Sequence, residues 1–534
     1  MGNPNLRRGA LLAALCAVTA CTVGPDFQRP ASFWSPASWF AARHPVVSAS
    51  NQRSQPSAEP LDPNWWSLFH DRELTSLEDR VAASNLDIRI ASIRLAESRA
   101  SLGVARAAAF PQVNANSSYT RELQSKKGVL SIFGGGPGGG GSPGAASNGL
   151  GGTSGGVPNT SLFNPFDLFQ AGFDASWELD FWGRVRRQVE SARAALDVGT
   201  EARRDTLLSA LAELARDYVQ LRGVQRSLQI TNENIAIARQ SVRITRERAA
   251  GGLATELDAI NAQAQLETTR SQIPDMLAQR QTLINAIALL LGEPPSAMDA
   301  ELGTDAPIPP VPPVVPVGLP GELARRRPDI RQAEASLHAA TADIGVAVGD
   351  FYPRFTLSGS AALQATQFKN LFGFSAGTYS FGPSVTLPIF EGGRLTRTLE
   401  LRKTQQQEAA ITYQRTVLGA LHDVNNALTN YASEQDKRAA LQAALAQNRR
   451  ALGLARAQYT QGLTDFLTVL DAQRTQLAAE QQLNNSLVTQ STDLVQLYKA
   501  LGGGWEQIYP ERPAPPANLV SDLTTIPGPA QTTP

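Results

Sequence analysis

The sequence predicts an α+β membrane protein in which one unit of strands and long helices occurs twice in a chain of 534 residues. Three observations support this prediction. The two halves of the chain resemble each other, four segments alternate apolar and polar residues, and two helical stretches of some sixty residues contain no proline.

Residues 1–20 are predicted to be an export signal. Arg7 and Arg8 precede an apolar run that is too short to span a bilayer. The run ends at Val18-Thr-Ala-Cys21, which is typical of a bacterial lipobox, so Cys21 is expected to become the lipidated first residue of the mature chain. The alternative is ordinary cleavage after a small residue. Cys16 leaves with the signal, so the mature chain is expected to contain no disulfide and no thiolate metal site.

Composition argues against several classes of function. Lys plus Arg equals Asp plus Glu at 48 each, so no strongly basic surface indicates a nucleic-acid partner. The four histidines are far apart in sequence, which argues against a metal site: His44, His70, His338 and His422. No catalytic constellation is recognisable, so we predict neither an enzyme nor a cofactor.

The internal repeat defines the predicted domains. Residues 87–111 match residues 329–353 at 10 of 25 positions. Matching positions of the two halves differ by 242 in residue number there but by 210 later in the chain, so the first half carries 32 extra residues. These fall in a Gly/Ser/Pro-rich tract, 134–160, expected to be a flexible loop. The predicted divisions are an N-terminal segment (21–71), a first repeat (72–291), a Pro-rich extended linker (292–322), a second repeat (323–501) and a tail (502–534).

Each repeat is predicted to contain a helix, two strands and long helices. Helical spacing covers 72–108, and period-two alternation follows at 113–119, 173–181, 355–359 and 379–389. Strands of about ten residues suit a bilayer, although a soluble two-sheet core would alternate in the same way. The helices from Arg184 to Ala250 and from Arg394 to Gln461 favour the membrane interpretation, because rods of ~100 Å suit a coiled coil or tube.

The strand number requires an assembly. Four strands cannot close a barrel around a lumen, and open edges are not tolerated in lipid. The chain must therefore share its barrel with copies of itself. Two copies would give eight strands and a filled interior, whereas three would give twelve strands and a channel.

Each pair of long helices is predicted to meet in a tight turn. Gly252 and Gly462 occupy matching positions and can take the left-handed conformation that ends a helix. Thr255 and Asp465 follow at matching positions and can cap the next helix. Leu467 and Asp471 are four residues apart, so they share one helix face. Under three-fold symmetry they would form Leu and Asp rings that close a pore. Alternatively, Asp465 and Asp471 only complement the N-terminus of their helix.

Motifs across the mature chain resemble those of the outer-membrane efflux channel family, the TolC-like and OprM-like factors. The motifs are Cys21-Thr-Val-Gly-Pro-Asp-Phe, Trp65-Trp66, Gly318-Leu-Pro, Arg326-Arg-Pro-Asp-Ile-Arg331, Phe351-Tyr-Pro, Pro388-Ile-Phe-Glu-Gly-Gly-Arg394 and Leu470-Asp-Ala-Gln473. The chain looks most like the lipoprotein branch that serves resistance-nodulation-division pumps. This resemblance implies a homotrimer with a 12-stranded β-barrel in the outer membrane, four strands per chain, continuous with a periplasmic α-helical barrel. It also implies an equatorial belt, built from both terminal segments and the linker.

The resemblance further implies a gate at the periplasmic tips. The gate tyrosine of the family falls on Tyr459, its first-repeat aspartate on Asp258, and its constricting residues on Leu467 and Asp471. Some members have an arginine where Thr464 stands here, so the resemblance does not extend to an Arg–Asp lock across the tips and leaves open how Asp258 is restrained. An alternative for Asp258 is helix capping.

The expected function is that of an outer-membrane exit duct in a tripartite efflux system. A periplasmic adaptor and an inner-membrane pump would open the tips, and transport through the lumen would be passive. Two alternatives stay open: the same duct serving type I secretion or metal export, and a lipid-anchored coiled-coil scaffold without a pore.

Overall fold

The computed structural model describes residues 22–29, 55–57, 61–123, 165–316 and 326–510. These residues group into two compact units, and the long helices run from one into the other. The first unit contains described residues of 1–26, 101–192 and 341–404, and the second those of 27–100, 193–340 and 405–534. Cys21 and the tract 134–160 lie outside the described residues, as does the end of the tail beyond residue 510.

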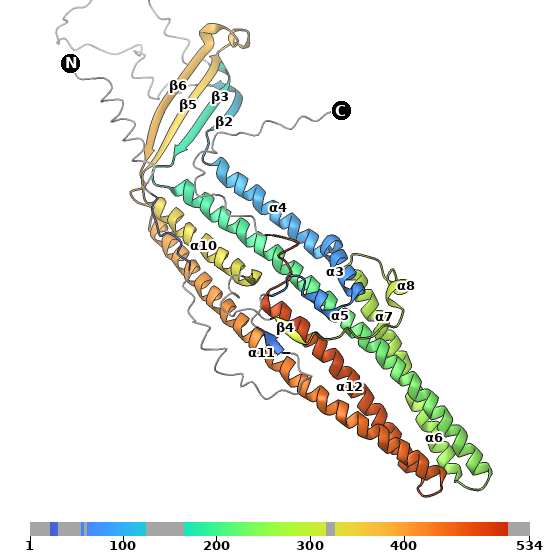
Figure 1. Ribbon diagram of the computed structural model, residues 1–534. Helices are drawn as coiled ribbons and strands as arrows, with labels where there is room; N and C mark the ends of the chain where they lie inside the picture. Colours follow the sequence, from blue (N-terminus) through green and yellow to red (C-terminus); the bar gives the residue numbers. More distant parts are fainter. Residues whose placement is uncertain (1–21, 30–54, 58–60, 124–164, 317–325, 511–534) are drawn as a thin grey trace, which may run out of the picture. The chain divides into compact units, whose positions relative to one another are not determined.

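The first unit contains a four-stranded antiparallel sheet with strand order β2-β3-β5-β6 (Figure 1). The strands are β2 (Gln112–Glu122), β3 (Phe166–Leu179), β5 (Arg354–Ala365) and β6 (Gly377–Thr386). Each half of the chain supplies one pair of neighbouring strands, and β3 joins the pairs through its register with β5, in which Phe173 opposes Ala361. The prediction of four strands per chain is confirmed for the described residues. Strands β2 and β6 form the two edges of this sheet.

The two faces of the sheet differ in chemistry. Directly opposed residues share a face, so the register sorts the side chains into an apolar and a polar set. The apolar face carries Val113, Ala115, Tyr119, Phe169, Phe173, Trp177, Phe355, Leu357, Tyr379, Phe381 and Val385. The polar face carries Asn114, Asn116, Ser118, Gln170, Asp174, Ser176, Ser358, Ser360, Gln364, Ser380 and Ser384. This is the division expected of strands with one lipid face and one wet face.

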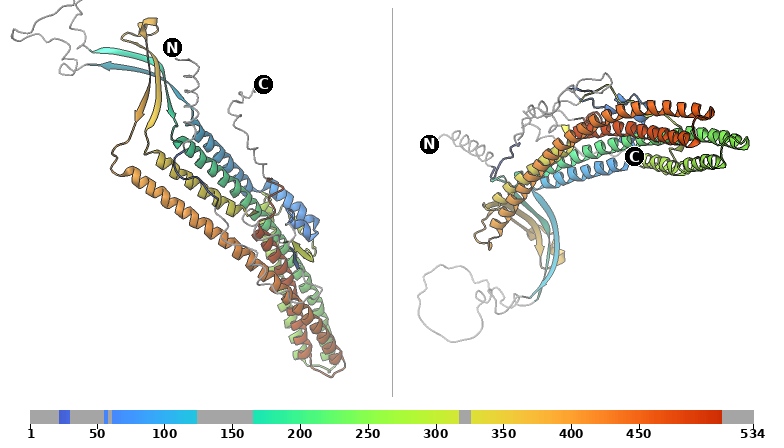
Figure 2. Two further views of the ribbon diagram at one scale, coloured as in Figure 1. Left: turned by 60° about the vertical axis from the view of Figure 1, so that its left-hand side comes forward. Right: turned by 90° about the horizontal axis from the view of Figure 1, so that it is seen from below.

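The second unit is helical. The helices α5 (Arg184–Ala250) and α11 (Arg394–Thr460) have 67 residues each and reach this unit from the first. Helix α6 (Glu256–Arg270) doubles back along α5, and α12 (Phe466–Leu501) doubles back along α11 (Figures 1 and 2). The bounds of α5 and α11 agree with the proline-free stretches, so the prediction of two long rods is confirmed. No helix among the described residues is both long and apolar enough to cross a lipid bilayer.

The main apolar core of the second unit lies near the middle of α5 and α11. It includes the 3₁₀ helix η1 (Trp65–Phe69), helix α3 (Arg72–Ser84) and residues of α5, α7 (Ile273–Leu290) and α12. Trp65 is fully buried and stacks on Tyr498 with ring centroids 5.4 Å apart, and Trp66 is buried beside it. Glu78 of α3 is also fully buried, and neither of its carboxyl oxygens has a hydrogen-bond partner in the part of the chain that the structure describes.

Several element bounds differ from the predictions. The single helix predicted over 72–108 is two helices, α3 and α4 (Leu86–Ala107), because the Asn85 side chain accepts a hydrogen bond from the amide of Ile88 and starts a new helix. The helix after the first tip is also divided, into α6 and α7, with Pro274 in the first turn of α7. Strand β6 ends at Thr386, before Pro388.

The linker is less extended than predicted. It contains the short helix α8 (Asp299–Leu302) and the strand β4 (Val314–Pro316). The strand β4 pairs in parallel with β1 (Gln55–Ser57) of the N-terminal segment. Helix α10 (Pro328–Gly349) opens the second repeat, and two 3₁₀ turns, η4 (Phe368–Asn370) and η5 (Phe374–Ala376), connect β5 to β6.

Candidate functional site

The candidate site is formed by the two helix–turn–helix tips. Gly252 has a φ of +70° and Gly462 a φ of +75°, so both glycines adopt the left-handed conformation expected of them. The amide of Leu253 donates to the carbonyl of Arg248 at 2.8 Å, and that of Leu463 to the carbonyl of Gln458 at 2.9 Å. These are the bonds of a Schellman motif, which ends each helix and reverses the chain.

The helices that follow the turns begin with side-chain caps. Thr255 and Asp258 form a reciprocal capping box, in which each side chain accepts the backbone amide of the other residue at 3.3 Å. Asp465 caps α12 by accepting from the amide of Thr468 at 3.1 Å and from its hydroxyl at 2.7 Å. These hydrogen bonds, the hydroxyl's first, lower the pKa of Asp465. Both caps stand at the positions given by the sequence pattern.

A small apolar core joins the two tips. It combines side chains of α5, α6, α11 and α12: Ile235, Ala238, Val242, Ala262, Leu266, Leu452, Ala455, Tyr459, Phe466, Val469 and Leu470. Tyr459 is buried, and its ring lies 5.6 Å from that of Phe466. Its hydroxyl has no hydrogen-bond partner among the described residues. Burial raises the pKa of Tyr459, the charge of Arg248 opposes this rise, and Asp258 adds to it. The Asp258 carboxylate accepts the backbone amide of Thr255 rather than the Tyr459 hydroxyl.

Leu467 and Asp471 lie on the exposed face of α12, opposite the buried Phe466, Val469 and Leu470. The exposed fraction of Leu467 is 52%. Asp471 forms no ion pair with any described side chain, and the nearby Arg474 donates instead to Gln265 of α6 at 2.6 Å. This helix face is therefore free in one protomer to meet another chain or a pore.

Arg248 is a contact residue of this site that the sequence analysis did not identify. It lies in the last turn of α5, and its Nη1 donates to the carbonyls of Tyr459 and Thr460 at 3.2 Å each. Its guanidinium also lies 4.8 Å from the centre of the Tyr459 ring. Arg248 thus binds the C-terminal end of α11, where a cation is favoured. Since its partners lie on a helix more than 200 residues away, no local spacing reveals this contact.

At Thr464, where some family members have an arginine, the side chain donates to the hydroxyl of Thr468 at 3.1 Å. No contact joins Thr464 to Asp258 among the described residues. The two tips are held together in this protomer by their apolar core, by Arg248 and by polar bonds between helices, such as Gln473 to Ser241 at 2.7 Å.

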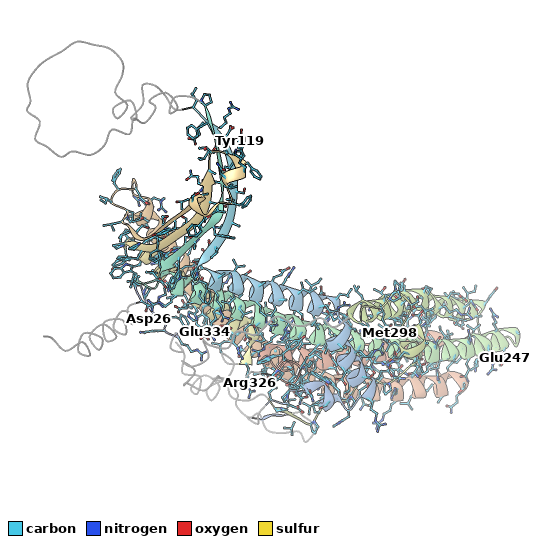
Figure 3. All side chains as sticks on the ribbon, turned by 90° about the horizontal axis from the view of Figure 1, so that it is seen from above. Asp26, Tyr119, Glu247, Met298, Arg326 and Glu334 are labelled. Atoms are coloured by element: carbon cyan, nitrogen blue, oxygen red, sulfur yellow. The ribbon has the colours of Figure 1, made fainter. Side chains whose placement is uncertain are left out.

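The first residues after Cys21 lie at the base of the sheet in the first unit. The amide of Val23 donates to the carbonyl of Trp182 at 3.0 Å, just beyond the end of β3. Arg187 at the start of α5 donates to the carboxylate of Asp26 and to the carbonyl of Val23; Figure 3 labels Asp26 and also Tyr119, which lies near the far end of β2. The chain that follows the expected lipid site is therefore tied to the junction of strands and helices.

No metal centre is present in the described ranges, where no three His, Cys, Asp or Glu side chains come together in a way that could hold an ion. His338 stacks on Phe27 at a centroid distance of 4.4 Å.

Comparison with known proteins gives consistent matches. The family model described as outer membrane efflux protein matches residues 77–293 and 319–503. The outer membrane protein OprJ of Pseudomonas aeruginosa is 31% identical over 508 residues, covering 95% of this chain and 98% of OprJ. The cation efflux system protein CusC of Escherichia coli is 28% identical over 491 residues, covering 92% and 97%. Among solved structures, the outer-membrane channel OprN superposes with a TM-score of 0.78 at 30% identity, covering 91% of this chain and all of OprN.

Proposed function

Starting from the fact that this chain belongs to the outer membrane efflux protein family and is an outer-membrane efflux component, we propose that it is a passive exit duct closed at its periplasmic end by the helix tips. The family consists of channels rather than enzymes. The main support for the proposal is that one chain contains both a sheet with an apolar and a polar face and two helical tips with complete turns, caps and a shared core. The family match favours this duct over a scaffold without a pore.

The duct is a homotrimer in this proposal. The sheet has only four strands, and its edge strands β2 and β6 are unpaired among the described residues. Strand edges exposed to lipid are costly, so neighbouring copies must pair them. Three copies close a 12-stranded barrel wide enough for a lumen. A stable purified monomer in detergent, measured by native mass spectrometry, would contradict this assembly.

The gate is formed by Leu467 and Asp471 in this proposal, with Tyr459 and Asp258 behind them. Both gate residues are exposed on one face of α12, and the Asp471 carboxylate forms no ion pair with a described residue. Three leucines around an axis would dewet a narrow opening, and three aspartates would repel one another. Tyr459 and Phe466 would support this face from the tip core.

The anchor is a lipid on Cys21. The position of Thr22 supports this anchor. Thr22 lies beside Gly183, which follows β3 and directly precedes α5. A lipid on the residue before Thr22 would therefore enter the bilayer next to the sheet. Lipid alone gives weak binding, so the sheet would supply most of the membrane attachment.

The partners are a periplasmic adaptor and an inner-membrane pump of the resistance-nodulation-division class. In this proposal the channel opens when a partner binds the open tips more tightly than the closed ones. Metal export is a second candidate cargo, because one relative is named a cation efflux system protein. Affinity purification of the crosslinked, tagged protein would identify the adaptor and distinguish these systems.

The test of the gate is conductance in planar bilayers. We expect wild-type channels to carry small currents and the double variant Leu467→Ala, Asp471→Asn to carry larger ones. The matched control is Glu256→Gln, which removes one negative charge from the first turn of the sister helix α6. If the double variant conducts like the wild type, or if the control opens the channel equally, the gate assignment is wrong.

A further inference from the structure

The polar face of the sheet carries few charges. Among its described residues only four are ionisable: Glu122, Asp174, Glu178 and Arg354. Glu122 is the last residue of β2. Glu178 is paired with Arg184 at 2.7 Å, and Arg354 with Asp350 at 2.7 Å, both near the ends of their strands that adjoin the helices. Asp174 alone lies in the middle of the face, and it forms no ion pair with a described residue.

Neutral side chains hold the Asp174 carboxylate in place. Asn114, directly opposite on β2, donates its amide nitrogen to one carboxyl oxygen at 3.2 Å, and Asn116 donates to the other oxygen. On the other side Asp174 opposes Ser360, whose hydroxyl bonds that of Ser380 on β6 at 2.8 Å. Asn114, Asp174, Ser360 and Ser380 thus form one polar row across all four strands. The row orients the negative charge without neutralising it.

We propose that Asp174 is a charge-selectivity residue of the outer-membrane section of the duct. The inference rests on the proposed trimer, in which the polar face lines the lumen and the row becomes a ring with three carboxylates. Such a ring attracts cations and lowers the local concentration of anions. Asn114 and Asn116 act as positioning residues, because their amides keep the carboxylate over the lumen face. The ring is separate from Asp471, which belongs to the tips.

The experiment uses the gate-opened background Leu467→Ala, Asp471→Asn, so that the tip aspartate does not dominate selectivity. Reversal potentials in a KCl gradient give the ratio of potassium to chloride permeability. We expect Asp174→Asn to lower this ratio at least about twofold and Asp174→Glu to retain it. The control is Asp167→Asn, the same change in the same strand but on the apolar face, where Asp167 accepts from Tyr119 at 2.9 Å; its ratio should equal that of the background.

A second variant tests the charge and not merely the fold. The chain has two cysteines, one in the export signal and one at the lipid site, so Asp174→Cys would supply a unique free thiol. A negatively charged methanethiosulfonate should restore cation preference, and a positively charged one should shift the reversal potential the opposite way. An unchanged ratio in Asp174→Asn, or a thiol that does not respond to either reagent in a conducting channel, would overturn the inference. A background that carries no current would overturn the duct itself, and this inference with it.

Discussion

Removing the Arg248 contact should open the channel. The change is Arg248→Met, which keeps a long apolar stem but removes the guanidinium. One Nη1 serves two carbonyls at 3.2 Å, so we count it as one charge-assisted hydrogen bond of about 1.5 kcal/mol. The contact with the Tyr459 ring at 4.8 Å adds about 0.5 kcal/mol at this half-buried position. The closed state should therefore lose about 2 kcal/mol per protomer, a factor of about 30 in its equilibrium with the open state.

The assay is the open probability of single channels in planar bilayers, where Arg248→Met should raise the open fraction. The control is Arg246→Met, because Arg246 donates to Gln263 at 3.0 Å inside its own helical hairpin and does not reach α11 in the described contacts. Arg248→Lys should give an intermediate result, since lysine keeps the charge and loses the planar fork. If Arg248→Met behaves like the wild type while the Leu467→Ala, Asp471→Asn channel opens, Arg248 does not stabilise the closed state.

Two further predictions concern stability. Burial raises the pKa of Glu78 well above its usual value of about 4.5. Above pH about 4.5 the unfolded chain loses this proton, whereas the folded protein keeps it. The free energy of unfolding should therefore fall as the pH rises above that value, by at most about 1.4 kcal/mol per pH unit. Glu78→Leu should remove this pH dependence and raise the thermal midpoint at pH 8; an unchanged slope would contradict the reasoning. A Cβ at Gly172 would lie 2.5 Å from the Cβ of Ala362, so Gly172→Val should reduce the yield of assembled protein in the outer membrane. A Cβ at Gly382 would meet open space, so Gly382→Ala should leave the yield unchanged. Equal yields of the two variants would refute the clash.

The long helices and the tip turns could be read from the sequence because their signals are local. An uninterrupted helical pattern, a glycine and a capping residue at matching positions in both repeats predicted α5, α11 and both turns with bounds close to those observed. The break at Asn85 was missed, because the apolar spacing continues across it and only the cap on Ile88 marks the new helix.

Contacts between distant segments could not be predicted. The pairing of β1 with β4 joins residues more than 250 positions apart, and no sequence pattern in either short segment indicates its partner. The contact of Arg248 with α11 is hidden for the same reason. Glu78 was missed because a glutamate in an amphipathic helix is normally solvated, and only the packed core shows that it is buried. For the site, residue spacing predicted which candidate side chains share a helix face, whereas their orientation toward a pore depends on an assembly of several chains.

The equal length of α5 and α11, 67 residues each, limits how this protein can evolve. Because both turns contribute to one apolar core, deleting two helical turns from α5 alone would stagger the tips by about 10 Å and separate Arg248 from its carbonyl partners. Natural variants with a shorter or longer periplasmic reach should therefore carry compensating insertions or deletions of the same size in both halves, and an adaptor that had adjusted to the original reach would have to change with them.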